Sequence, residues 1–456
     1  MSEMRGNVMS TGIKELDELL NGGFPEGYIV LVAGHPGAGK TTFAANFLYS
    51  GCINGEAGIY VSFAERKMEF LRHMKALGMD FGELERRGLF SFIEGFTIIR
   101  EEGIEELLEF IVGILNKIDA RRLVIDPIDA LIRLISESKA RAFLHTTLFD
   151  IVKPARITTY LIAELPLGKE VIGYGFEEFV VDAVIKLTIK PYKRGLLRRS
   201  LILHKVREIP IPKYEYEFII DKGGIILHRP LSSKELSGSI KSERISSGIK
   251  GLDEMLGGGF FRNSFIVVSG PSGTGKTVIS LIFAQHSASI GEKVLYITFE
   301  ESREQVELEL RLLGYDVKML KDHLIIKSIS LELLTPERIS YMYRRLIESY
   351  KPSIVIFDGA SIVKRYYTEE DYFSFFTEIA QMNKNNNITT LITAIEDILH
   401  GERLEIDTLA DTIIALSFNG TKEGIRRTIS IIKHRGSWHD TRKREYVIRK
   451  GMVVIK

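Results

Sequence analysis

The sequence has one cysteine, no long apolar run and no excess of charge of either sign. A single cysteine, Cys52, cannot form an internal disulfide, so we interpret it as a packing residue in a cytoplasmic protein. Nothing reaches the roughly 20 apolar residues of a membrane span, and MSEMRGNVMSTG at the start has no apolar signal-peptide core. Because 61 basic residues nearly balance 60 acidic ones, no overall field favours nucleic acid or a membrane as partner.

An internal repeat organises the chain of 456 residues, which is longer than one ordinary core needs. TGIKELDELLNGGF at 11–24 aligns without a gap with SGIKGLDEMLGGGF at 247–260. The same spacing relates GHPGAGKT at 34–41 to GPSGTGKT at 270–277. The repeat indicates two related domains.

The coarse order of strands and helices is the same in both halves. Continuous apolar strands separated by helical segments predict an α/β fold with a mainly parallel, doubly wound sheet in each half. The last strands of each half follow one another closely, which predicts an antiparallel edge. The Ser- and charge-rich segment 231–243 is typical of a linker. We therefore expect a first domain at 1–230 and a second at 244–456.

Each half contains a complete P-loop pattern, G-x4-G-K-T. Glycines let backbone N–H groups converge on phosphate oxygens, the lysine reaches the β and γ oxygens, and the threonine ligates Mg²⁺. Two copies, each between an apolar strand and a helix whose dipole favours phosphate, argue against a glycine turn without a ligand. The predicted ATP-binding residues are Gly34, Gly37, Ala38, Gly39, Lys40, Thr41 and Thr42 in the first half, and Gly270, Ser272, Gly273, Thr274, Gly275, Lys276, Thr277 and Val278 in the second.

A carboxylate at a strand end is the expected second group on the metal side. Asp126 and Asp358 each follow an apolar strand. With Thr41 and Thr277 they are predicted to hold Mg²⁺ through its water shell. A plain strand-capping aspartate is the alternative, and the P-loops favour the metal site. We interpret Asp129 as a helix-start or surface residue.

The two halves differ where hydrolysis needs a group to orient water. VSFAERK in the first half corresponds to ITFEESR in the second, so Ala64 stands where the second half has Glu300. We expect these residues to end the strand beside the P-loop strand. Glu300 is then the predicted base, with Glu301 beside it, and Glu65 is what the first half retains. Solvated glutamates that open a helix are the alternative. We predict a weakly hydrolysing first domain and a second domain that carries the chemistry.

The sequence resembles the KaiC family of two-domain RecA-like ATPases from about Thr11 to Val454. The resemblance rests on the paired SG-x3-LDE-x-L-GGGF and P-loop layout, on FEES, DTLADTII and RGSWHD in the second half, and on YGFEEFVVDAVIKL at 174–187. It implies two tandem RecA-like P-loop domains, a homohexamer of two stacked rings, and ATP at each subunit interface.

In rings of this family, a lysine and an arginine on a late strand reach the γ-phosphate of the neighbouring subunit. By position these are Lys205 and Arg207 in the first half, and Lys433 and Arg435 in the second. A cation supplied in trans stabilises the charge that develops in the transition state. The alternative is that these residues are solvated charges on an edge strand.

The second domain of proteins in this family also resembles an autokinase. Thr408 falls at the phosphoacceptor threonine, whereas Asp407 and Glu402 stand where the family has a serine and another threonine. Alternatively, Asp407 and Thr408 cap a local turn, which we favour. The sequence stops at Lys456 without the C-terminal tail of the clock proteins, so we expect an ATPase or signalling relative.

Two other functions stay open. The basic stretch KPYKRGLLRR at 190–199 could grip nucleic acid in the ring of a RecA- or RadA-related DNA-repair ATPase, although a solvated hairpin is the interpretation we favour. The second is a regulatory module in which ATP serves only to build a ring that presents a surface to an unknown protein partner.

Overall fold

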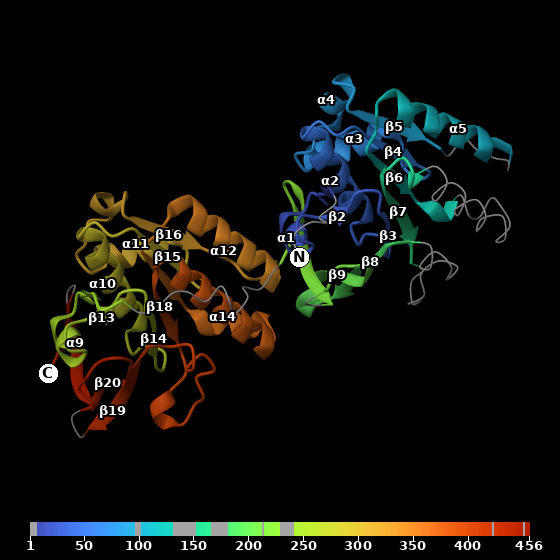
Figure 1. The fold of residues 1–456 in the computed structure, drawn as a ribbon. Coiled ribbons are helices and arrows are strands. Elements are labelled where there is room, and N and C mark those ends of the chain that lie inside the picture. The colour runs from blue at the N-terminus through green and yellow to red at the C-terminus, as the bar shows by residue number, and fades with distance from the viewer. Residues whose placement is uncertain are drawn as a thin grey trace. The chain divides into compact units, whose positions relative to one another are not determined.

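The computed structural model describes residues 7–95, 102–130, 152–165, 181–211, 214–228, 241–421, 424–449 and 452–456. The chain divides into two compact units, Met1–Arg229 and Pro230–Lys456 (Figure 1). Most of the expected linker, residues 231–240, lies outside the described residues, as does the first part of the segment 174–187. Each unit is described by itself below.

The first unit is built on a nine-stranded sheet with the order β11-β10-β9-β8-β3-β7-β6-β4-β5. Its strands are β3 (Ile29–Gly34), β4 (Gly58–Ser62), β5 (Phe90–Glu94), β6 (Arg122–Asp126), β7 (Thr158–Glu164), β8 (Ala183–Pro191), β9 (Leu197–Val206), β10 (Glu215–Asp221) and β11 (Gly224–Leu227). The helices are α1 (Lys14–Leu19), α2 (Lys40–Ile53), α3 (Lys67–Ala76), α4 (Phe81–Arg86) and α5 (Glu102–Lys117), and β1 (Val8–Met9) pairs with β2 (Phe24–Pro25).

The second unit has a nine-stranded sheet with the equivalent order β16-β15-β17-β18-β14-β19-β20-β21-β22. Its strands are β14 (Phe265–Ser269), β15 (Val294–Thr298), β16 (Leu324–Ser328), β17 (Ile354–Asp358), β18 (Thr389–Ala394), β19 (Thr412–Thr421), β20 (Gly424–His434), β21 (Arg444–Arg449) and β22 (Met452–Ile455). The helices are α9 (Lys250–Met255), α10 (Lys276–Ser289), α11 (Arg303–Leu312), α12 (Pro336–Tyr350), α13 (Val363–Tyr366) and α14 (Glu369–Asn385), and β12 (Arg244–Ile245) pairs with β13 (Phe260–Phe261).

Both sheets are parallel in their larger part and antiparallel at one edge, which confirms the predicted fold class. In the first unit the strands from β5 to β8 pair in parallel, and β9, β10 and β11 continue the sheet antiparallel. The second unit repeats this division from β16 to β19 and from β20 to β22.

The sheet of the first unit is covered on both faces. Along β3, Val30 and Val32 pack into the core that contains α2, whereas Leu31 and Ala33 pack into the core that contains α5 (Figure 1). Successive side chains of a strand point to opposite faces, so a strand buried on both faces must be apolar throughout. This explains the continuous apolar run before each P-loop.

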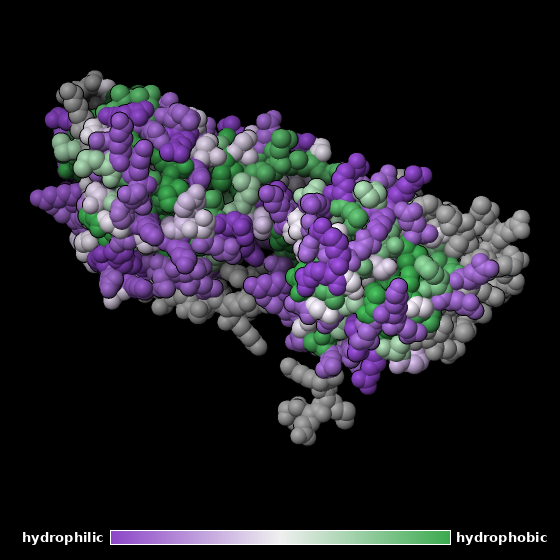
Figure 2. All heavy atoms as spheres, turned by 90° about the horizontal axis from the view of Figure 1, so that it is seen from above, coloured by the Kyte–Doolittle hydropathy of each residue, from purple (hydrophilic) through white to green (hydrophobic). Residues whose placement is uncertain are grey.

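Outside these cores the surface is mainly polar. Hydrophilic side chains cover much of the face seen in Figure 2, interrupted by smaller apolar areas. Among the described residues, no helix combines the length and the apolar character that crossing a bilayer requires.

A buried arginine ties the start of β6 to the P-loop helix of the first unit. Arg122 is only 1% exposed. Its guanidinium donates to the carbonyl oxygens of Ser10 (2.7 Å) and Phe47 (2.6 Å), and to the carboxylate of Glu56 (2.8 Å). A Cβ added to Gly51 of α2 would lie 2.0 Å from Nε of Arg122. Glycine at this position therefore makes room for the guanidinium.

Arg122→Met should destabilise the first unit by about 2–4 kcal/mol, because it leaves two carbonyl oxygens in a buried region without their charged donor. Differential scanning calorimetry of the full chain measures the change. The matched control is Arg121→Met at the neighbouring position, where the side chain is 45% exposed and lies 3.4 Å from Glu26; the control should change stability by less than about 0.5 kcal/mol. Equal effects of the two substitutions would contradict the role assigned to Arg122.

Candidate nucleotide sites

The two P-loops connect a buried strand to a helix in the same way. Gly39 and Gly275 precede α2 and α10 with φ of 102° and 100°, a left-handed conformation that side chains other than glycine rarely adopt. Gly37 also has a positive φ of 77°, and a Cβ added there would meet nothing within 4 Å. The first loop is therefore open at Gly37, where phosphates are expected. The remaining predicted residues, Ala38, Thr42, Ser272, Gly273, Thr274 and Val278, lie in these loops or in the first helical turns.

Each P-loop lysine folds back over its own loop. Lys40 Nζ donates to the carbonyl oxygens of Gly34 (2.8 Å) and His35 (3.1 Å), and Lys276 Nζ donates to those of Gly270 (2.7 Å) and Pro271 (3.0 Å). Burial lowers the pKa of both lysines, against the opposing effect of nearby carboxylates. Phosphate oxygens would replace these carbonyl partners and restore the preference for the charged amine.

The strand-end aspartates lie beside the P-loop threonines. Thr41 Oγ1 donates to Asp126 Oδ2 at 3.0 Å, and Thr277 Oγ1 donates to Asp358 Oδ2 at 3.0 Å. Burial raises the pKa of Asp126, although donors and Lys40 oppose this shift. A hydroxyl and a carboxylate fit Mg²⁺, which in phosphate sites takes one or two protein ligands and completes its shell with phosphate and water.

The glutamates are not on the strand beside the P-loop strand, and this expectation was wrong. β14 pairs with β18 and β19, whereas Glu300 follows β15, which pairs with β16 and β17. Strands β17 and β18 therefore lie between β15 and β14. A crossover order of this kind leaves no local trace in the sequence, because each strand has the same apolar pattern.

Glu300 nevertheless lies close to the second nucleotide site. A Cβ added to Gly359, the residue after Asp358, would lie 3.1 Å from Cγ of Glu300. The negative charges of Asp358 and Glu300 both act on Lys276. Glycine at 359, with φ of 80°, thus leaves room for Glu300 beside the metal-side aspartate.

Glu301 and Glu65 have different partners in the two domains. Glu301 is next to Glu309 of α11, and burial together with the charges of Glu309, Asp358 and Glu300 raises its pKa to about 7. Its Oε2 atom is buried and has no hydrogen-bond partner among the described residues. Glu65 instead lies 2.7 Å from Nδ1 of His73, so that an imidazole stands where the second domain has the carboxylate of Glu309.

Asp129 is a site residue that the sequence did not identify. It lies at the start of a helix that begins at Ile128, as one of the two predicted alternatives stated, but it is 7% exposed and so is not a surface residue. Its Oδ2 accepts the backbone N–H of Glu164 at 2.7 Å, and its charge acts on Lys40. In the second domain Ser361 accepts the N–H of Ile395 at 2.9 Å. The end of the strand beside each P-loop strand is therefore fixed by a polar side chain that follows the metal-side aspartate.

Two further arginines contact the P-loops. Arg199 Nε donates to the carbonyl oxygen of Gly37 (3.4 Å), and Arg427 Nε donates to that of Gly273 (3.2 Å). The basic stretch at 190–199 thus brings at least one of its cations to a P-loop. Neither contact was predicted. The two arginines are nevertheless equivalent positions of the repeat, because they are as far apart in the sequence as the predicted trans lysines of the two halves.

The predicted trans residues of the second domain are held by the segment before β19. Lys433 Nζ donates to the carbonyl oxygen of Asp407 (2.8 Å), and Arg435 lies 3.6 Å from Asp411 and 3.4 Å from the carbonyl oxygen of Thr408. Burial and the charge of Arg435 lower the pKa of Lys433. Thr408 is exposed in the turn 405–409.

The first domain has the same arrangement. Lys205 Nζ donates to the carbonyl oxygen of Val181 (2.9 Å), and Arg207 lies 3.1 Å from Asp182. A register shift interrupts β8/β9 between Val184 and Ile185, and β19/β20 is interrupted in the same way between Ile413 and Ile414. A bulge of this kind redirects the side chains that follow it.

These cations lie at the opposite end of the sheet from the P-loop of their own domain. His434, between Lys433 and Arg435, pairs with Thr412, and Thr412 pairs with Ile266 near the start of β14. The P-loop follows the end of β14, which has five residues, or roughly 16 Å of strand.

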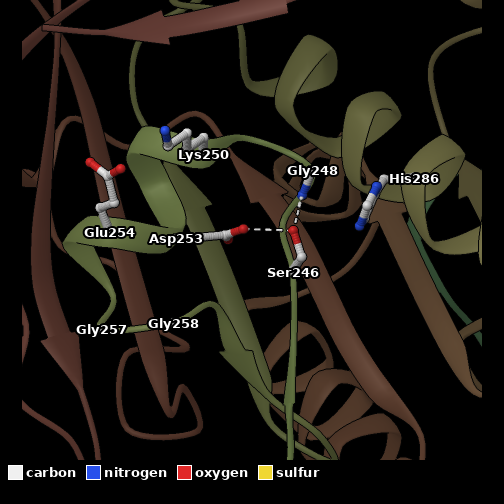
Figure 3. A pocket seen from close by; sticks show the side chains of 8 residues that line it. All are labelled: Ser246, Gly248, Lys250, Asp253, Glu254, Gly257, Gly258 and His286. Carbon is white, nitrogen blue, oxygen red and sulfur yellow. Dashed lines mark hydrogen bonds between the residues drawn. The ribbon is translucent and has the colours of Figure 1, made fainter.

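The repeated SG-x3-LDE motif forms a turn that packs on the P-loop helix. Asp253 accepts hydrogen bonds from Ser246 Oγ (2.6 Å) and from Oγ (2.6 Å) and N (2.8 Å) of Ser247, while Ser246 Oγ accepts the N–H of Gly248 (3.0 Å) (Figure 3). Asp17 holds the equivalent turn of the first domain. The motif is thus explained by local structure.

A shallow hollow lies over this turn in each domain, of about 500 Å³ in the second and about 570 Å³ in the first. Several of its polar groups are bonded to one another, as Figure 3 shows for Ser246 and Asp253. The residues that line the second hollow are Ser246, Gly248, Lys250, Asp253, Glu254, Gly257, Gly258 and His286.

Two equivalent sheets, each with a P-loop after a central strand and a Thr–Asp pair beside it, define a tandem P-loop nucleotide-binding protein. The sequence matches the family described as "ATPase: KaiC" over residues 9–232 and 245–456. The chain therefore belongs to the KaiC family of ATPases, with tandem RecA-like domains, and the resemblance predicted from its motifs is confirmed.

Relatives with assigned names match along the whole chain. The chain is 31% identical over 480 residues to "Circadian clock oscillator protein KaiC" of Parathermosynechococcus lividus. This alignment covers 100% of the present chain and 87% of the relative. It is 32% identical over 469 residues to "Circadian clock protein KaiC3" of Synechocystis sp., covering 98% and 92%. "Circadian clock protein KaiC2" of Synechocystis sp. is 32% identical over 461 residues, covering 96% and 79%.

Glu301→Gln should change how stability depends on pH. Because the folded pKa of Glu301 is about 7 and its ordinary value is 4.5, the stability that its proton contributes is fully present below about pH 4.5 and is lost as pH rises through about 7. Glutamine stays neutral. The variant should therefore melt roughly 2 °C or more above wild type at pH 8, with the difference closing toward pH 5, in thermal melts without nucleotide.

The control for this pH effect is Glu304→Gln, in the first turn of α11, the helix that follows Glu301. Hydrogen bonds at the helix start lower the pKa of Glu304, so this group is ionised in folded and unfolded chains from pH 6 to 8. Its variant should keep a constant offset from wild type over that range. A Glu301→Gln offset that is equally constant would show that Glu301 is not protonated near neutral pH.

Proposed function

We propose that this KaiC-family ATPase binds Mg-ATP at both P-loops and hydrolyses it mainly in the second domain. The single observation that carries the division of labour is the carboxylate of Glu300 beside Gly359 and Lys276, where the first domain has Ala64. The Thr–Asp pairs are alike in both domains, which supports binding at both sites.

The groups of the second site have separable tasks. Lys276 moves from the carbonyl oxygens of its loop to phosphate oxygens and neutralises part of their charge. Thr277 and Asp358 hold the metal ion, which when bound supplies further positive charge to the phosphates. Glu300 accepts a hydrogen bond from the attacking water and orients it toward the γ-phosphate. Burial of the strand ends keeps these groups in place before nucleotide binds.

The first site lacks a counterpart of Glu300, because Ala64 stands at that position. Glu65 lies one residue further along the chain, and His73 pairs with it at 2.7 Å. This contact directs the carboxylate toward α3. We therefore assign the first domain to nucleotide binding and assembly, with slow turnover at most.

We further propose that the chain forms a homohexameric ring with nucleotide between subunits. Support comes from the position of Lys433 and Arg435, which lie at the end of the sheet away from their own P-loop. A cation there serves a phosphate only when a neighbouring copy brings its P-loop to it. Lys205 and Arg207 have the same position in the first domain.

We also propose that Thr408 is a phosphoacceptor. Thr408 is exposed, and its carbonyl oxygen lies 3.4 Å from Arg435. If Arg435 reaches a neighbouring γ-phosphate, Thr408 lies close to the same phosphate. Asp407 beside it already carries a negative charge.

Glu300→Gln should lower ATP turnover of the full chain by about 100-fold or more, because the amide cannot accept a proton from water. Release of inorganic phosphate measures turnover, and ATP binding should stay within about threefold of wild type. Glu65→Gln is the matched control in the first domain and should lower turnover by less than about twofold. Wild-type turnover in Glu300→Gln would reject Glu300 as the base, and a larger loss in Glu65→Gln would reverse the roles of the domains.

Lys40→Ala should mainly weaken assembly, because it removes the phosphate contact of the domain assigned to holding the ring. Native mass spectrometry with ATP should show smaller species, whereas turnover per assembled chain falls by less than about threefold. Lys276→Ala is the counterpart and should abolish most turnover while the ring persists. An intact ring in Lys40→Ala would contradict the division proposed here.

A further inference from the structure

The two nucleotide sites hold their aspartates through different donors. Tyr60 of β4 and Tyr296 of β15 occupy equivalent positions, and both are buried, at 1% and 0% exposure. Each lies near the metal-side aspartate of its domain. The hydroxyl of Tyr60 is bonded to Asp126, whereas that of Tyr296 is bonded to Ser280 and interacts with Asp358 in addition. The residues around the two tyrosines explain this difference.

In the first domain the tyrosine supplies a donor to the aspartate. The hydroxyl of Tyr60 donates to Asp126 Oδ2, the oxygen that also accepts the hydroxyl of Thr41. The ring of Tyr60 is stacked on Phe92 at a centroid distance of 5.4 Å and lies 4.6 Å from Phe70. Aromatic packing therefore holds the hydroxyl against the carboxylate.

In the second domain a threonine supplies the additional donor. Thr277 donates to Asp358 Oδ2 (3.0 Å), and Thr393 donates to Asp358 Oδ1 (2.6 Å). The hydroxyl of Tyr296 lies 3.0 Å from Ser280 Oγ. The carboxylate is thus held from both of its oxygens.

Two substitutions between the repeats account for the difference. Thr393 of β18 corresponds to Ile162 of β7, because each pairs with the equivalent residue of its P-loop strand. Ser280 of the P-loop helix corresponds to Ala44. Neither Ile162 nor Ala44 has a side-chain hydroxyl, so the first site lacks both the threonine donor and the serine partner, and Tyr60 bonds to the aspartate.

We propose that Tyr60 is a positioning residue of the first nucleotide site, which holds Asp126 in the orientation that receives the metal ion of Mg-ATP. Thr41 and Asp126 would hold the metal ion together, and a Thr41 hydroxyl that ligates the ion would no longer donate to Asp126. Tyr60 is buried and keeps its bond, so the carboxylate stays in place. Thr393 performs this task in the second domain. The inference rests on the proposed binding of Mg-ATP at the first P-loop.

Tyr60→Phe, which keeps the stacked ring and removes only the hydroxyl, tests this role. The full chain carries Lys276→Ala, which disables the second site, so that the first site alone binds nucleotide. Binding of a fluorescent non-hydrolysable ATP analogue to this chain is measured at increasing MgCl₂ concentrations and, separately, in excess EDTA. The Mg²⁺ concentration for half-maximal binding should rise about 10-fold, whereas affinity in EDTA stays within about twofold. A structural loss alone would weaken binding equally with and without Mg²⁺.

Three variants complete the test. Tyr296→Phe in a Lys40→Ala chain, the same change at an equally buried position, should shift the Mg²⁺ requirement of the second site by less than about threefold. Ile162→Thr added to Tyr60→Phe supplies the donor that Thr393 provides and should bring the requirement back to within about threefold of wild type. Thr393→Val in the Lys40→Ala chain should raise it about 10-fold at the second site, and this variant decides the matter if Tyr60→Phe does not fold.

Two outcomes separate this inference from the function on which it rests. If the parent chain binds the analogue at the first site independently of Mg²⁺, the proposed Mg-ATP site fails, and the role of Tyr60 fails with it. If the parent chain depends on Mg²⁺ and Tyr60→Phe shows the same dependence, only the role of Tyr60 is overturned. Equal shifts in Tyr60→Phe and Tyr296→Phe would also overturn it, because the partners of the two hydroxyls would then not matter.

Discussion

Each nucleotide site depends on one hydrogen bond, from the P-loop threonine to the aspartate at the end of a strand two places away in the sheet. The bond joins the first turn of the P-loop helix to a strand that the loop itself does not touch. Backbone pairing fixes the position of the acceptor, since Asp126 and Asp358 are in register with Ser62 and Thr298 of the neighbouring strands. The P-loop and the strand-end aspartate are therefore placed together by the sheet.

Duplication has preserved this bond and altered the charges around it. In the second domain Glu300, Glu301 and Glu309 gather next to Asp358, and burial together with the charges of the other three carboxylates raises the pKa of Glu301 to about 7. In the first domain Ala64 removes one carboxylate and His73 gives Glu65 a partner. Three carboxylates nevertheless act on the P-loop lysine of each domain, so both sites concentrate negative charge that a metal ion and a cationic partner would relieve.

Local patterns predicted the parts of the site that are fixed by neighbours in sequence. The spacing of strand, loop and helix predicted the P-loop glycines, Asp126 and Asp358. The occurrence of the same pattern in both halves strengthened this prediction. Residues placed by long-range pairing were harder to predict. The position of Glu300 two strands from the expected one depends on the crossover order, the burial of Asp129 depends on the end of β7, and the contact of Arg199 with Gly37 depends on where the antiparallel edge meets the loop.

The proposed ring follows from the polarity of the parallel strands. A P-loop sits at the carboxyl end of its strand, and the bulged antiparallel strand delivers Lys433 and Arg435 to the amino end. One domain cannot bring both ends of its sheet to one phosphate. Two copies in a head-to-tail contact can, and a head-to-tail contact repeats until it closes into a ring or extends as a filament. Nucleotide bound at such a contact has ligands from both copies, so its binding free energy also stabilises the assembly.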